Sequence, residues 1–188
     1  MFATECIHDT PLQHSYTLFV TVRTETTMRY LTSILLLVSI CQGSAAFAGD
    51  NQDQINAILK HSDAPFGVVF EIVESDADAL DWAIPQIKSY AKQLRAKFPD
   101  IGIAVVTHGK EEFALTKSNS AKHKEVHKIV QSLVKDDQIP VHVCGTHASW
   151  YGKKPEDFPD YVDVAPAGPT QIRDYVDMGY KKIVLEEP

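Results

Sequence analysis

The stretch VHVCGTHASWYG, residues 141–152, brings together side chains that can do chemistry. Cys144 ends a short apolar run and is followed by Gly145, Thr146 and His147. We expect a strand before this cysteine and a short helix after it. Free backbone N–H groups at a helix N-terminus stabilise a thiolate, as does a nearby imidazolium. Cys144 is therefore either a reactive thiol or a small packing residue, because free cysteines are among the most buried residue types.

Three histidines fall at positions from which they could act with Cys144. His142 precedes it by two residues and would share its face of a strand, His147 follows by three, and His108 ends what we expect to be a neighbouring strand. A Cys/His metal site is one interpretation, but neither a C-x-x-C motif nor a second cysteine in the same domain accompanies these residues. We predict no metal and no cofactor.

Backbone amides near the same strand ends are the predicted anion-binding or substrate-binding groups. They belong to Gly109, Gly145 and Thr146. Nucleotide-binding glycine motifs and the G-x-S-x-G nucleophile elbow are not found in the sequence.

Residues 28–48 (MRYLTSILLLVSICQGSAAFA) have the pattern of a secretory signal peptide. A basic start, an apolar core of about ten residues and an A-x-A ending predict cleavage after Ala48. The apolar core is too short to span a bilayer, which takes roughly 20 residues. Lipid attachment at Cys41 is the less favoured interpretation, because the bulky Ile40 precedes it. We therefore expect a periplasmic or secreted protein with no membrane span after cleavage.

The remaining chain divides into three parts. Residues 1–27 do not fit in front of a signal peptide and are expected to be a non-native extension, with Met28 as the true start. Residues 49–64 form a polar leader segment, and residues 65–188 form one domain. The mature chain carries 16 basic and 22 acidic residues, a net charge of −6, which argues against a nucleic-acid partner. Cys144 is its only cysteine, so no internal disulfide can form, and the thiol is either buried and inert, paired between chains, or reactive.

Strand and helix patterns alternate along this domain. Apolar, β-branched runs predict strands and amphipathic stripes predict helices. The predicted strands cover residues 66–73, 101–109, 138–144 and 181–187, with a shorter extended piece within 158–168. One predicted helix starts at residue 80, a second covers about 126–134, and a third runs from Gly168 to a stop at Gly179. We predict an α/β fold, a three-layer α/β/α sandwich of flavodoxin size with a mostly parallel sheet of about five strands.

The segment IAVVTHGK and the later stretch IPVHVCGTHASWYGKKPEDFPDYVDVAPAGPTQIRDYVDMGYKKI resemble the DsrE/DsrF-like sulfur-relay family. The resemblance covers roughly residues 64–186 and rests on the order and spacing of several motifs. It places Cys144 at the position of the sulfur-carrying cysteine, His108 and Gly109 at the adjacent turn, and Gly168 and Gly179 at structural turns. The signal peptide and His147 are departures from the family pattern.

The resemblance implies a homo-oligomer, a trimer or hexamer, and a cysteine that carries sulfane sulfur as a persulfide. We therefore expect an exported, sulfurtransferase-type sulfur carrier whose partners are sulfane-sulfur donor and acceptor proteins or small thiols. His108 or His147 would favour the Cys144 thiolate and hydrogen-bond the persulfide. Two alternatives stay open: a non-catalytic module that binds a metal or small anion near Cys144, and an oligomeric scaffold in which Cys144 is inert.

Overall fold

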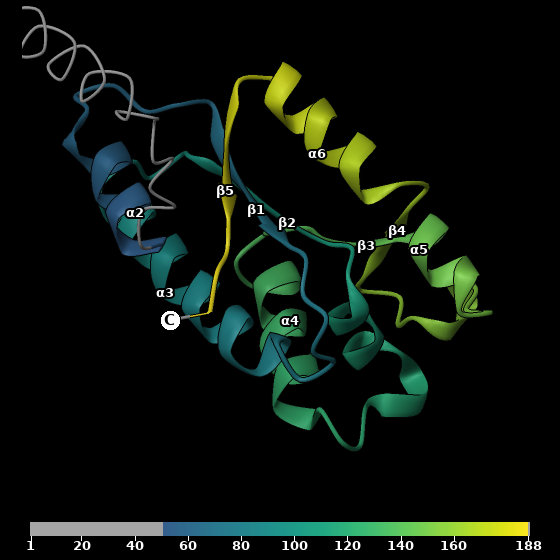
Figure 1. The fold of residues 1–188 in the computed structure, drawn as a ribbon. Helices are drawn as coiled ribbons and strands as arrows, with labels where there is room; N and C mark the ends of the chain where they lie inside the picture. Colours follow the sequence, from purple (N-terminus) through teal and green to yellow (C-terminus); the bar gives the residue numbers. More distant parts are fainter. Residues whose placement is uncertain (1–50, 188) are drawn as a thin grey trace, which may run out of the picture. The chain divides into compact units, whose positions relative to one another are not determined.

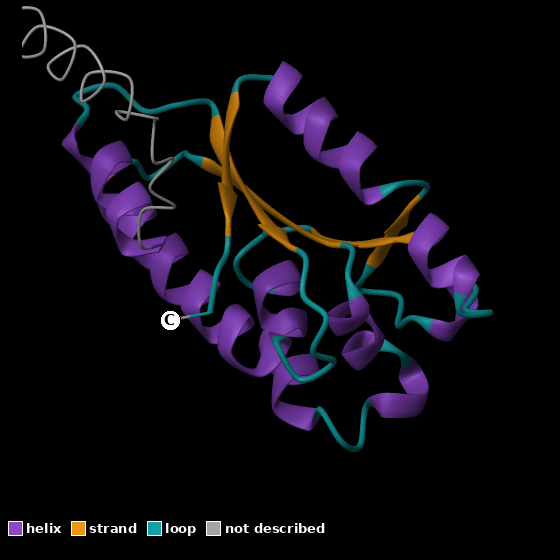
Figure 2. Ribbon diagram, in the orientation of Figure 1, coloured by secondary structure: helices purple, strands orange, loops and turns teal. Residues whose placement is uncertain are grey.

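The computed structural model describes residues 51–187, which contain a five-stranded parallel sheet with helices on both faces (Figures 1 and 2). The strand order is β4-β3-β2-β1-β5, and every neighbouring pair is parallel. The strands are β1 (Gly67–Ile72), β2 (Gly102–Thr107), β3 (Val141–Cys144), β4 (Asp163–Ala165) and β5 (Tyr180–Val184). The predicted α/β sandwich is confirmed.

One face of the sheet is covered by the helices α2 (Asn51–Lys60), α3 (Leu80–Lys97) and α4 (Lys124–Lys135), and the other by α6 (Gly168–Asp177) (Figure 1). Alternate strand residues enter the two layers, as the pleat requires. On the side of α3 and α4, residues such as Phe70, Val105 and Val143 join the large core cluster. On the side of α6, Val69 and Val106 pack in a second cluster.

Short helices connect the strands at their carboxyl ends. The 3-10 helix η1 (Lys110–Leu115) follows β2 and is continued by η2 (Lys117–Asn119). Helix α5 (Gly145–Trp150) follows β3 directly, and η3 (Pro155–Asp157) precedes β4. The short helix after Cys144 was expected, whereas η1 was not.

Backbone geometry explains where the observed strands and helices begin and end. Strand β3 begins at Val141 and not at 138, because Gln138 adopts a left-handed φ of 54° and Pro140 has no N–H to donate. Gly179 has a φ of 92°, which explains why α6 stops before it. The predicted leader segment contains α2, whose Ile55 is fully buried in the large core cluster.

The proposed extension 1–27 and the signal peptide 28–48 lie outside the described residues. Within residues 51–187, the structure contains no helix with the length and apolar character needed to cross a bilayer.

Candidate functional site

Cys144 lies at the carboxyl end of β3 and is the residue from which α5 starts. Its backbone is still extended, with φ −85° and ψ 105°, while Gly145 begins the helix. The amide of His147 donates to the Cys144 Sγ at 3.4 Å, so the sulfur atom takes the place of an N-cap acceptor. Cys144 is 4% exposed and is the free cysteine of the described residues. Sequence reasoning placed the thiol at this strand–helix junction, and the structure agrees.

Glu112, which sequence reasoning did not single out, connects Cys144 with His147. One carboxylate oxygen, Oε2, accepts the amide of Cys144 at 2.9 Å, and the other, Oε1, lies 2.9 Å from Nδ1 of His147. Glu112 is in η1 and is fully buried. Burial raises the pKa of its carboxyl from 4.5 to about 7, although the bonds from Cys144 and His147 favour the charged form.

Aromatic rings hold the imidazole of His147 in place. Phe113 stacks on it with ring centroids 5.4 Å apart, and Trp150 and Tyr151 pack around it at 5.8 and 5.1 Å. Trp150 is 73% exposed and Tyr151 is 52% exposed, so these rings form an exposed aromatic rim beside the site. We call Phe113, Trp150 and Tyr151 the aromatic rim below.

His108, the second predicted histidine, belongs to a different set of contacts. Its Nε2 lies 2.9 Å from Oε1 of Glu71, and the other oxygen of Glu71 accepts from Lys182 of β5 at 2.6 Å. The hydrogen bond from His108, followed by the bond and charge of Lys182, lowers the pKa of Glu71 to about 2 despite partial burial. This carboxylate is therefore ionised throughout the physiological range.

Gly168, the first residue of α6, lies against both His108 and Cys144. A Cβ built on it would lie 2.7 Å from the His108 Cβ and 3.3 Å from the Cys144 Cβ. The absence of a side chain lets α6 start close to these two predicted site residues. The structure therefore brings Cys144, His147 and His108 to the same edge of the sheet, each histidine with its own carboxylate.

Two of the three backbone amides predicted to bind an anion, those of Gly109 and Thr146, are hydrogen-bonded within the chain. The amide of Gly109 donates to Glu111 at 2.9 Å, and the amide of Thr146 donates to the carbonyl of Pro166 at 3.1 Å. A Cβ on Gly145 would lie 3.0 Å from the carbonyl oxygen of Ala165, so this glycine allows close packing of β4. These contacts give the three residues structural roles, and anion binding by their amides stays a prediction.

His142, which shares the strand face of Cys144, is a buried packing residue. Its Nε2 is 2.9 Å from the Tyr175 hydroxyl of α6, and burial lowers its pKa. Among residues 51–187, no group of three or more His, Cys, Asp or Glu side chains has an arrangement that could hold a metal ion.

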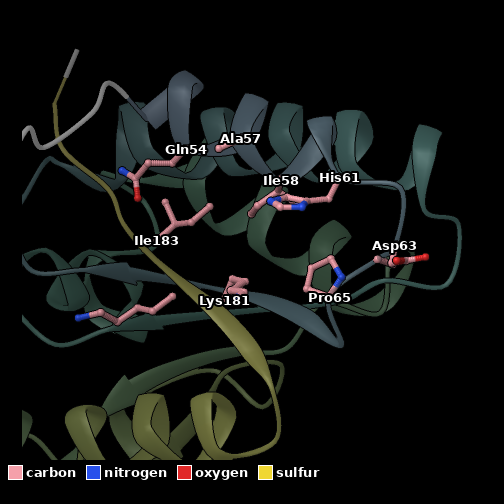
Figure 3. Close-up of a pocket in the computed structure, with 10 residues that line it drawn as sticks. Gln54, Ala57, Ile58, His61, Asp63, Pro65, Lys181 and Ile183 are labelled. Atoms are coloured by element: carbon pink, nitrogen blue, oxygen red, sulfur yellow. The ribbon is translucent and has the colours of Figure 1, made fainter.

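Two clefts lie near the sheet edges. One, of about 530 Å³, is between α2 and β5 and is lined by Ile58, His61, Lys181 and Ile183 among others (Figure 3). A second, of about 550 Å³, includes Gly145 and Thr146 beside Cys144. The second cleft thus borders the two residues that follow Cys144 in the chain.

Comparison with known proteins supports the fold. No family model and no curated protein matches the sequence. A solved structure of a protein of unknown function, MTH1491 from Methanobacterium thermoautotrophicum, superposes with a TM-score of 0.50 at 20% identity, covering 63% of this chain and 97% of that one. A conserved protein of unknown function, BT1422 from Bacteroides thetaiotaomicron, gives 0.45 at 14% identity over 62% and 94% of the two chains. The first likeness is one of fold alone.

Proposed function

We propose that this chain is a sulfur carrier in which Cys144 holds sulfane sulfur as a persulfide. The observation that carries the proposal is the contact between the Cys144 Sγ and the amide of His147, at 3.4 Å, at the start of α5. A hydrogen bond from a helix N-terminus favours the thiolate, which is the nucleophilic form of cysteine. The motif order shared with the DsrE/DsrF-like sulfur-relay family supports the same assignment.

The two transfer steps need no oxidant or reductant beyond the sulfur donor and the acceptor thiol. In loading, the Cys144 thiolate attacks the outer sulfur of a sulfane donor such as thiosulfate, the donor's S–S bond breaks, and sulfite leaves with the electron pair. In delivery, an acceptor thiolate attacks the outer sulfur of the Cys144 persulfide, and Cys144 leaves as a thiolate. The proposed partners are donor and acceptor proteins or small thiols.

The cellular setting is part of the proposal. The signal-peptide pattern at residues 28–48 supports a periplasmic or secreted location, and the family resemblance supports a homotrimer or homohexamer. In an oxidising compartment the acceptor thiol has to be kept reduced by its own partner protein.

Mass spectrometry of the intact protein tests the sulfur-carrier role. Wild type treated with thiosulfate or polysulfide should gain one sulfur atom, about 32 Da as expected for the thiol-to-persulfide exchange, and lose it to an added thiol. Cys144→Ser should gain nothing. Equal uptake by the two proteins would refute the proposal. A native thiol that no alkylating reagent labels would favour the inert-scaffold alternative.

A further inference from the structure

Glu112 contacts both residues of the candidate site from an element that neither belongs to. Its Oε2 accepts the Cys144 amide at 2.9 Å, and its Oε1 lies 2.9 Å from His147 Nδ1. One carboxylate on η1 therefore fixes the strand end that carries the thiol and the imidazole of the following helix. The buried position of Glu112 prevents water from replacing either contact.

We propose that Glu112 is a positioning residue that holds His147 with a proton on Nδ1, so that Nε2 exchanges protons with the sulfur compounds that react at Cys144. This inference rests on the sulfur-carrier function proposed above. An ionised carboxylate can only accept hydrogen bonds, so its contact with Nδ1 requires a proton on that nitrogen. Neutral imidazole carries one proton, which leaves Nε2 as the basic atom. A carboxylate that orients a histidine in this way is a recurring arrangement beside nucleophiles.

The surroundings of His147 fit an exchanging group. Within residues 51–187, Nε2 of His147 has no hydrogen-bond partner in the structure. The side chain is 15% exposed, and the aromatic rim fixes the plane of its ring. A small thiol arriving from solvent can therefore meet an imidazole that is already oriented.

The burial of Glu112 makes the proton exchange sensitive to pH near neutrality. The groups that face its carboxylate are Cys144 and His147 on the β3–α5 segment and Glu111 on its own helix, and the Tyr151 ring packs against the imidazole with ring centroids 5.1 Å apart. The hydrogen bonds from the Cys144 amide and the His147 ring favour the ionised form of Glu112. Burial raises the pKa of Glu112 to about 7, so the Glu112–His147 pair gains or loses a proton in the pH range where thiols react.

The proton balance of delivery can be written with these groups. An acceptor thiol gives its proton to Nε2 of His147, and its thiolate attacks the outer sulfur of the Cys144 persulfide. The S–S bond of the persulfide breaks, its electron pair goes to Sγ of Cys144, and the imidazolium returns the proton to solvent or to the new thiolate. When Glu112 is ionised, its carboxylate balances the charge of the imidazolium.

The tautomer of His147 tests the inference directly. In full-length protein labelled with ¹⁵N-histidine, the His147 signals are identified by their loss in His147→Gln and read at pH 8. We expect wild type to show Nδ1 protonated and Nε2 bare. In Glu112→Gln the amide oxygen keeps the Cys144 contact and the amide nitrogen donates to Nδ1, so the tautomer should reverse. The exposed Glu156→Gln should leave it unchanged.

The pH dependence of sulfur uptake at Cys144 is the second measurement. Wild type and Glu156→Gln should show an inflection near pH 7 that Glu112→Gln lacks. A wild-type His147 with its proton on Nε2 at pH 8 overturns the inference, even if Glu112→Gln fails to fold. If Glu112→Gln folds and its His147 tautomer is the same as in wild type, the inference is overturned as well. Absence of sulfur uptake in wild type at every pH refutes the carrier function, whereas the tautomer still reports on Glu112.

Discussion

The wild-type protein should become less stable as pH rises because of Glu112, and replacing Glu112 with glutamine should abolish this decrease. Burial raises the pKa of this carboxyl from 4.5 to about 7 in the folded protein. An acid with a raised folded pKa contributes stability that is fully present below the unfolded pKa and is lost as pH rises through the folded value. The window in which Glu112 acts therefore runs from about pH 4.5 to about pH 7.

The size of the effect follows from the two pKa values. They differ by about 2.5, and each unit corresponds to about 1.4 kcal/mol, so the unfolding free energy of wild type should fall by about 3 kcal/mol across this window. Glutamine is neutral at every pH and has a similar shape. The unfolding free energy of Glu112→Gln minus that of wild type should therefore rise by about 3 kcal/mol between pH 4.5 and pH 8.

Glu71 provides a matched variant of opposite sign. Its pKa is lowered to about 2, first by the hydrogen bond from His108 and then by Lys182, so its contribution is present above pH 4.5 and is lost as pH falls toward 2. Glu71→Gln should therefore flatten the acid side of the stability curve and leave the alkaline side unchanged.

Urea unfolding at a series of pH values, followed by circular dichroism and tryptophan fluorescence, measures these differences. Wild type, Glu112→Gln, Glu71→Gln and the exposed Glu156→Gln should be compared in the same buffers. If wild type and Glu112→Gln give parallel curves from pH 4.5 to pH 8, the folded protein does not hold a proton on Glu112, and the reasoning from burial is wrong.

Two further substitutions test the packing around the site and the core. Gly168→Ala would place a Cβ 2.7 Å from that of His108. We therefore expect the unfolding free energy, measured by thermal unfolding, to fall by about 1–3 kcal/mol and sulfur uptake at Cys144 to slow. The control Thr170→Ala, in the same helical turn, should change neither quantity. Ile55→Ala should lower the unfolding free energy by about 2–5 kcal/mol, because this side chain of α2 is completely buried. A loss no larger than that caused by Asp53→Ala, at an exposed position of the same helix, would show that α2 does not contribute to the core.

Hydrophobic pattern was enough to predict the sheet and the position of Cys144. Strands buried on both faces give nearly continuous apolar runs, so β1 and β2 were visible in the sequence. Cys144 was placed at a strand end because it closes the third apolar run of the sequence. The order β4-β3-β2-β1-β5 did not follow, because strand pairing depends on contacts between residues far apart in the chain.

Glu112 was missed because two adjacent acidic residues after a strand are usually a solvated turn. In the structure, η1 turns both Glu111 and Glu112 inward, where they accept backbone amides at the ends of the strands. A weak signal was present: the pair lies between Gly109 and the apolar residues Phe113 to Leu115, a setting more apolar than that of most charged turns. Sequence alone could not show which amides needed acceptors.

The two histidines near Cys144 differ in the carboxylate that each contacts, and this difference favours His147 as the proton-exchanging group. Glu71 also accepts a hydrogen bond from Lys182, so the carboxylate that contacts His108 stays ionised near neutral pH. Glu112 is fully buried, and the effect of this burial on its pKa exceeds that of the hydrogen bonds from Cys144 and His147. Its proton is therefore lost near pH 7. A pair that changes protonation in this range can follow the protonation of a thiol, whereas the His108–Glu71–Lys182 network keeps a constant charge on its carboxylate. Sulfur uptake that loses its pH dependence in Glu71→Gln and keeps it in Glu112→Gln would reverse this assignment.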